Sequence, residues 1–165
     1  MNVKTIVKWG ILLGVAEVIG TQMLTWLGLG LTNWFIIMMH VLTIVFVILS
    51  LKDLKKQTES KINFLHAVIL VFCIVLIARL IFQIYMFIYI NYIDPMWLET
   101  VAISWTTTLQ EQNYTQDQIG NTIESFRNSY KTIPMFTSAL LMYAIPFIAE
   151  GIIIAAVYLF ITKKI

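Results

Sequence analysis

Long apolar runs separated by short polar stretches dominate the chain. A helix of about 20 apolar residues crosses the ~30 Å hydrocarbon core of a bilayer. Four runs reach about that length: Ile6–Leu27, Asn33–Leu51, Ile62–Tyr92 and Pro134–Ile161. The second is the shortest and still matches the core, whereas the third is over-long and must tilt or project beyond it. The pattern predicts an all-α, polytopic membrane protein with four transmembrane helices.

The segment 93–133, between the third and fourth runs, is far more polar. The pair Asp94–Pro95 is typical of a helix start, with aspartate as the N-cap and proline at the first helical position. Trp97, Val101 and Trp105 follow at four-residue spacing, which indicates a helix with one apolar face. We expect these three interfacial side chains to lie on the bilayer surface or on the helix bundle.

A second helix of this polar segment is predicted to begin near Thr115. Thr115 and Gln118 stand three residues apart, as in a capping box. The two helices together predict an external helical cap. Since four runs exhaust the hydrophobic segments, we expect residues 1–165 to form a single membrane domain.

Composition agrees with a membrane location. Hydrophobic residues make up 59% of the 165 residues and charged residues 12%, whereas a soluble domain carries about 25% charged residues. The single cysteine, Cys73, lies inside the third run, so the sequence contains neither a disulfide framework nor a zinc-type spacing. We predict no cofactor and no metal site.

The basic residues are distributed unevenly along the chain. By the positive-inside rule, this distribution places both termini in the cytoplasm and the segment 93–133 outside. Anionic lipid headgroups suffice to explain the basic side, so we expect the lipid bilayer and no nucleic acid as a partner. Eight of the eleven lysines and arginines lie at the two ends or between the second and third runs: Lys4, Lys8, Lys52, Lys55, Lys56, Lys61, Lys163 and Lys164.

The first run carries a carboxylate, Glu17, in its apolar middle. A charge at that depth is costly, so it should face protein or water and have a partner. Small residues on the same face would let a second helix approach closely, as in a small-xxx-small seam. These residues are Gly10, Gly14, Thr21 and Gly28.

Two further charges, Arg79 and Glu150, lie within the third and fourth runs. We expect both to converge with Glu17. His40, in the second run, lies about 15 Å deep by helical rise, the same depth as Glu17, which makes the two a plausible pair. One interpretation is a buried ion cluster that locks the bundle. The other is a ligand or proton site, since intramembrane ionisable groups often mark transport pathways.

Several short motifs resemble a family of small four-helix membrane proteins typical of Bacteroidetes, a domain of unknown function. The strongest is the stretch Tyr89–Glu99, where an aromatic helix end leads into Ile-Asp-Pro and then Leu-Glu. Lys8–Gly10 with Gly14, and Asn63–Ala67, are also similar to the family pattern. The resemblance implies a fold and a bacterial inner membrane, but it implies no activity and no catalytic residues.

The sequence favours a non-enzymatic role. It has no His-Glu-x-x-His motif and no nucleophile elbow, and His40 and His66 lie at different depths. The leading hypothesis is an accessory or scaffold subunit that binds lipid, another membrane protein or a copy of itself. The alternative is a small carrier or flippase-like protein for a lipid-linked or proton-coupled substrate, using Glu17, Arg79 and Glu150.

Overall fold

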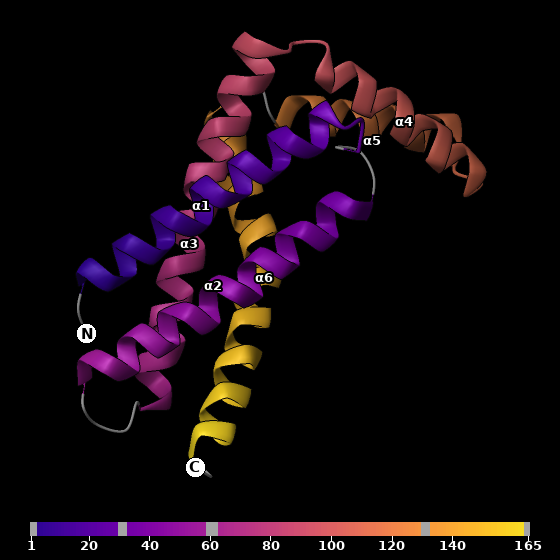
Figure 1. Cartoon of the computed structure of the whole chain (residues 1–165). Coiled ribbons are helices and arrows are strands. Elements are labelled where there is room, and N and C mark those ends of the chain that lie inside the picture. Colours follow the sequence, from indigo (N-terminus) through magenta and orange to yellow (C-terminus); the bar gives the residue numbers. More distant parts are fainter. Residues whose placement is uncertain (1–2, 30–32, 59–62, 130–132, 164–165) are drawn as a thin grey trace. The chain divides into compact units, whose positions relative to one another are not determined.

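A computed structural model gives the arrangement of the chain (Figure 1). It describes residues 3–29, 33–58, 63–129 and 133–163, and the side chains of these residues except 33, 58, 129, 133–143 and 162–163. Lys61 and Lys164, which entered the orientation argument, lie outside the described residues. Within the described ranges every regular element is a helix, so the predicted all-α class is confirmed.

The helices follow one another with short connections. In chain order they are α1 (Val3–Trp26), α2 (Asn33–Thr58), α3 (Phe64–Ile88), the π-helical turn η1 (Tyr89–Ile93), α4 (Trp97–Glu111), α5 (Gln116–Ser129) and α6 (Ile133–Lys163). The chain divides into two compact units. The first combines Met1–Phe82 with Met142–Ile165, and the second is Gln83–Leu141.

Within the described residues, three helical segments are long and apolar enough to cross a membrane: Trp34–Gln57, Phe64–Ile93 and Ala144–Ile161. The membrane-like character expected from the sequence is thereby confirmed. The first predicted run is not among the three, and α1, which covers it up to Trp26, also carries Lys4, Lys8 and Glu17. A fourth crossing along α1, and an external position for α4 and α5, stay predictions.

In the first unit, α1 packs closely against α3 through its glycines. A Cβ atom on Gly10 would lie 2.8 Å from the Cβ of Ile77, and one on Gly14 would lie 3.1 Å from the Ala78 carbonyl oxygen. These distances are too short for a larger residue without movement, so the predicted small-residue seam is confirmed at these two positions. Gly28 instead ends α1 in a left-handed turn with φ of 72°, a conformation that glycine adopts without strain.

The helix α2 extends to Thr58, seven residues beyond the predicted run Asn33–Leu51 (58 − 51 = 7), so the predicted end of this helix is wrong. Side chains from α1 hold this extension in place. The Trp9 indole donates a hydrogen bond to Asp53 over 2.9 Å, and the Thr5 hydroxyl donates one to Gln57 over 2.9 Å. Lysine is also a good helix former, so a basic stretch can extend a helix beyond the apolar run.

The core of the first unit lies where α1, α2, α3 and α6 meet (Figure 1). Branched aliphatic side chains dominate it, and α3 contributes the largest share. The buried members of this core are Ile6, Leu13, Val47, Leu51, Leu54, Ala67, Leu70, Val71, Ile74, Val75, Ala78, Ala155 and Leu159.

The second unit contains a helical hairpin of α4 and α5. The helix α4 begins at Trp97 with Met96 as its N-cap residue, so the prediction of Asp94 as N-cap and Pro95 as first helical residue is wrong. The Asp94 carboxylate still accepts a hydrogen bond from the Trp97 backbone N–H over 3.1 Å. At the other end of α4, Asn113 adopts a φ of 63°, and the Tyr114 N–H donates to the Leu109 carbonyl. This is the geometry of a Schellman-type helix end.

The start of α5 is fixed by the predicted capping box. The Gln118 N–H donates to the Thr115 hydroxyl over 3.3 Å, and the Thr115 N–H donates to the Gln118 side-chain oxygen over 2.9 Å. Two otherwise unpaired backbone donors are thus satisfied reciprocally. Ala102, Ile119 and Ile123 then form a small apolar core between the two helices.

Candidate functional site

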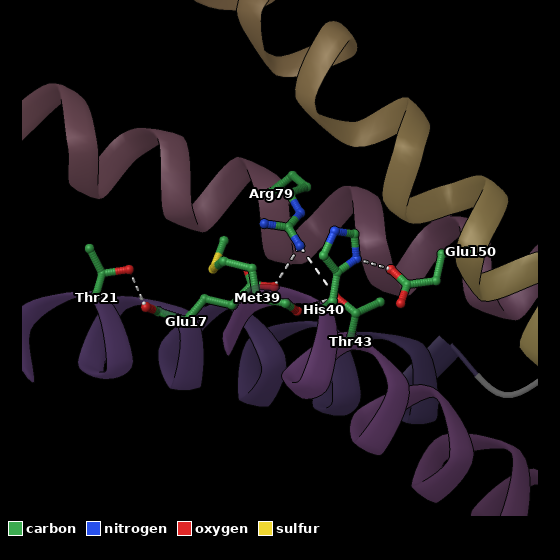
Figure 2. Close-up of polar contacts among 7 residues, drawn as sticks. All are labelled: Glu17, Thr21, Met39, His40, Thr43, Arg79 and Glu150. Carbon is green, nitrogen blue, oxygen red and sulfur yellow. Dashed lines mark hydrogen bonds and ion pairs between the residues drawn. The ribbon is translucent and has the colours of Figure 1, made fainter. Parts of the chain in front are cut away.

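Arg79 of α3 and Glu17 of α1 form an ion pair inside the first unit (Figure 2). The Arg79 Nη2 atom lies 2.8 Å from Glu17 Oε1, and the two side chains are 2% and 0% exposed. Gly10 and Gly14 precede Glu17 on one face of α1, so the seam that brings the backbones together also brings the charges together. Arg79 also donates a hydrogen bond, over 3.3 Å, to the Thr43 hydroxyl of α2.

The carboxylate of Glu17 is incompletely satisfied. Its approach to Arg79 falls outside hydrogen-bond geometry, and neither of its oxygens accepts a hydrogen bond from the residues that the structure describes. The nearby Thr21 hydroxyl donates to the backbone carbonyl of Glu17 and not to its side chain. The pair is therefore held by charge and enclosure, which makes each partner depend strongly on the other.

His40 of α2 contacts Glu150 of α6, not Glu17, so the pairing of His40 with Glu17 is wrong. The His40 Nδ1 atom lies 2.8 Å from Glu150 Oε2. Equal depth was the basis of that pairing, but depth does not fix the direction in which a side chain leaves its helix. Figure 2 shows His40 directed toward α6, while Thr43, three residues later, is directed toward Arg79.

Phe147 joins the two pairs. The Arg79 guanidinium carbon lies 3.7 Å from the centre of its ring, and the imidazole of His40 stacks on it at 4.8 Å between centroids. A desolvated cation–π contact of this kind contributes about 2 kcal/mol. Glu150 also attracts Arg79 electrostatically, although the direct ion pair of Arg79 is with Glu17.

All four charged or titratable residues singled out from the sequence thus lie in one connected group. We call this group the charged centre, and it comprises Glu17, His40, Thr43, Arg79, Phe147 and Glu150. It draws on α1, α2, α3 and α6.

The two pairs differ in exposure. Glu17 and Arg79 are buried, whereas the side chains of His40 and Glu150 are 42% and 21% exposed. The charged centre therefore runs from the interior of the first unit to its surface. Its outer end, His40 with Glu150, is open to a ligand or a partner.

Phe147 was not recognised as part of the site from the sequence. Its signal was present, since it lies three residues before Glu150 and so shares a helix face with it. An aromatic residue in an apolar run is most often core, and only the fold shows that this one contacts both Arg79 and His40.

The three candidate interfacial residues lie within the second unit. Val101 is buried, Trp97 meets the Tyr89 ring edge-on at 6.5 Å, and Trp105 packs against Phe126 of α5 at 4.7 Å. Trp105 is still 42% exposed. This face of α4 thus serves internal packing, and any contact with a bilayer uses what remains of it.

Metal binding requires several ligands at one place. Among the described residues, no group of three or more His, Cys, Asp or Glu side chains is placed to hold a metal ion. The charged centre contributes two carboxylates and one imidazole, divided between two separate pairs.

The fold and the site together define a helical protein of membrane type with charges enclosed among its apolar helices. The chain belongs to the family described as "Protein of unknown function (DUF4199)", whose model matches residues 8–162. The resemblance to a domain of unknown function is thus confirmed. Searches of curated proteins and of solved structures found no significant match.

Proposed function

We propose that the protein is a four-span protein of a bacterial inner membrane and that it acts as an accessory or scaffold subunit for another membrane protein, lipid or a copy of itself. In this arrangement α1 is the fourth crossing, and α4 with α5 forms the external cap. Both termini lie in the cytoplasm. The support is the set of apolar helices, the uneven distribution of lysines, and the close packing of α1 along α3.

The exposed pair His40–Glu150 carries this proposal. Both residues lie in segments apolar enough to cross a membrane, yet both remain partly uncovered. Polar groups at membrane depth are costly unless they face protein or a water-filled cavity. A partner protein that covers this pair would shield it from lipid and so remove that cost. Such contact with a partner is expected of an accessory subunit.

The buried pair Glu17–Arg79 gives a second argument for the same proposal. A fully enclosed ion pair packed beside a glycine seam suits a fixed scaffold, since removal of either charge leaves the other uncompensated. We assign no catalytic residue and propose no enzymatic activity.

For the cap, we propose contact with the outer membrane surface through the exposed parts of α4. Trp105 is the predicted interfacial residue that stays half exposed, and Ile103 beside it is 68% exposed. Tryptophan prefers the headgroup region of a bilayer. Val101 contributes to the hairpin core instead.

A carrier is the second candidate, and the continuity of the charged centre favours it. A series of contacting side chains connects the interior of the unit to its surface: Glu17, Arg79, Phe147, His40 and Glu150. A lipid-linked or proton-coupled substrate could use such a path. Transport by purified protein in liposomes, abolished by Glu17→Gln or Glu150→Gln with the fold intact, would establish this alternative.

Affinity purification in a mild detergent tests the accessory role. We expect a stoichiometric partner or a specific lipid with the wild-type chain, and its loss from Glu150→Gln. Glu124→Gln is the matched control, because it makes the same change at an exposed position of α5. Retention of the partner by Glu150→Gln would contradict the assigned surface, and transport without any partner would favour the carrier.

The orientation has a direct test. Cysteine is introduced at Gln112 or at Lys56, both exposed, with Cys73→Ser as background. An impermeant thiol reagent added to cells with a permeabilised outer membrane should label position 112 and not position 56. The opposite pattern would invert the proposed topology.

A further inference from the structure

Along both helices, the exposed residues within four positions of His40 and of Glu150 are apolar. They include Ile36, Ile37 and Val41 on α2 and Ile153 on α6. All four are more than two-fifths exposed. The pair is thus the polar part of an otherwise aliphatic surface. A partner that binds here must contact both polar and apolar groups.

The contact between His40 and Glu150 uses one polar atom of each side chain. His40 contributes Nδ1 and Glu150 contributes Oε2. Among the described residues, the imidazole Nε2 and the carboxylate Oε1 have no hydrogen-bond partner. Stacking on Phe147 holds the plane of the imidazole, so the direction of Nε2 is set before any partner arrives.

These two unused atoms complement each other. In its protonated form, an imidazole that contacts a carboxylate through Nδ1 has one N–H left to donate, and the carboxylate has one oxygen left to accept. A two-fold axis beside the pair brings the imidazole of each copy against the carboxylate of the other. The aliphatic side chains on α2 and α6 then pack around a closed set of four polar side chains.

We infer that a second copy of this chain covers the face formed by α2 and α6, with His40 of each copy contacting Glu150 of the other. The inference rests on the proposed accessory role in a membrane and names the partner for it. Acyl chains offer no polar group to this pair. A helix from a different protein would need to bring both a donor and an acceptor at the same depth, whereas a second copy supplies both by symmetry.

Energy transfer between labelled copies tests the inference. The full chain is prepared with a donor or an acceptor fluorophore on a C-terminal tag and reconstituted in liposomes over a range of protein-to-lipid ratios. The variants are His40→Phe, which keeps a ring to stack on Phe147, and Glu150→Gln. Glu124→Gln on α5 is the control. Wild type and control should associate equally, and each single variant should associate at least tenfold more weakly.

The mixture of the two variants gives the sharpest result. In a pair formed by one His40→Phe copy and one Glu150→Gln copy, the intact histidine of one faces the intact carboxylate of the other. The mixed pair should therefore associate more strongly than either variant does with itself. Association that is equal in all three cases would overturn the inference, as would a wild-type chain that is monomeric at every protein-to-lipid ratio.

A cross-linking measurement covers the case in which a variant fails to fold. Ala149→Cys, at an exposed position beside Glu150, is combined with Cys73→Ser and treated with a short bis-maleimide in membranes. We expect covalent dimers, and none from Ile11→Cys on the exposed side of α1. The reverse pattern would overturn the inference. A monomeric chain that loses a different co-purifying protein on Glu150→Gln would also overturn it, while the accessory role itself would stand.

Discussion

The two ionic contacts of the charged centre have the same length but differ in their exposure to solvent. Glu17–Arg79 and His40–Glu150 each join atoms 2.8 Å apart, but the first is enclosed and the second is partly open. An enclosed pair depends on its own partner, because no solvent replaces a lost charge. An open pair can exchange its surroundings for a ligand or another protein. Distance alone therefore does not distinguish a structural contact from a binding surface, and exposure does.

Arg79→Met should have the largest effect on stability. It leaves the carboxylate of Glu17 buried without a counter-charge, which costs about 3–5 kcal/mol of unfolding free energy. The double variant Glu17→Gln with Arg79→Met should lose less than Arg79→Met alone. Unfolding in mixed detergent micelles measures both. Arg127→Met is the control, since Arg127 pairs with Glu99 at the surface and should change stability by about 1 kcal/mol or less. A double variant as unstable as the single one would refute the dependence between partners.

Gly14→Ala tests the seam that encloses the buried pair. The new Cβ would lie 3.1 Å from the backbone of Ala78, so the neighbouring atoms of α3 must shift by a few tenths of an ångström. We expect a loss of about 1–3 kcal/mol, as for other overpacked cores. The matched control is Gly120→Ala on α5, where nothing lies within 4 Å and helix propensity predicts a gain of up to about 1 kcal/mol. Equal effects at the two glycines would mean that the seam does not constrain the pair.

Thr115→Ala should have an intermediate effect, confined to the second unit. It removes the capping hydroxyl of α5 and costs about 1 kcal/mol. Amide hydrogen exchange should accelerate across the first turn of α5. Thr122→Ala, in the same helix, removes only a hydroxyl that donates to a backbone carbonyl, and should leave that turn protected. Faster exchange throughout the charged centre in Thr115→Ala would contradict the separation of the two units.

Glu150→Gln should have the smallest effect on the stability of the isolated chain. The pair with His40 is partly solvated, and such pairs contribute about 0–1 kcal/mol. The same detergent unfolding measurement applies, with Glu124→Gln as the reference. A loss as large as that of Arg79→Met would show that the open pair also locks the bundle, and the contrast between the two pairs would disappear.

The helical class was predictable because apolar runs of membrane length have few other solutions in a bilayer. The capping box at Thr115 and the close approach at Gly10 and Gly14 were also predictable, since each depends on local chemistry at a fixed spacing. These features need no knowledge of which helices are neighbours.

The pairing within the charged centre was only partly predictable. Counting helical rise gives the depth of His40 but not its direction around α2, and a helix turns about 100° with each residue. His40 and Thr43 therefore face different neighbours although they are three residues apart. The extension of α2 to Thr58 had no apolar signal, because hydrogen bonds from Trp9 and Thr5 hold it.

The position of Glu17 in the chain has a consequence for how the protein is made. In the proposed four-span arrangement, α1 leaves the ribosome before α3 and carries a carboxylate whose partner, Arg79, is synthesised 62 residues later (79 − 17 = 62). A charged side chain at the centre of a helix costs about 3 kcal/mol during membrane insertion. The first helix is therefore poorly suited to settle in lipid alone. Its final integration should therefore wait until α3 emerges. The helices would then enter the bilayer as a group and not one at a time.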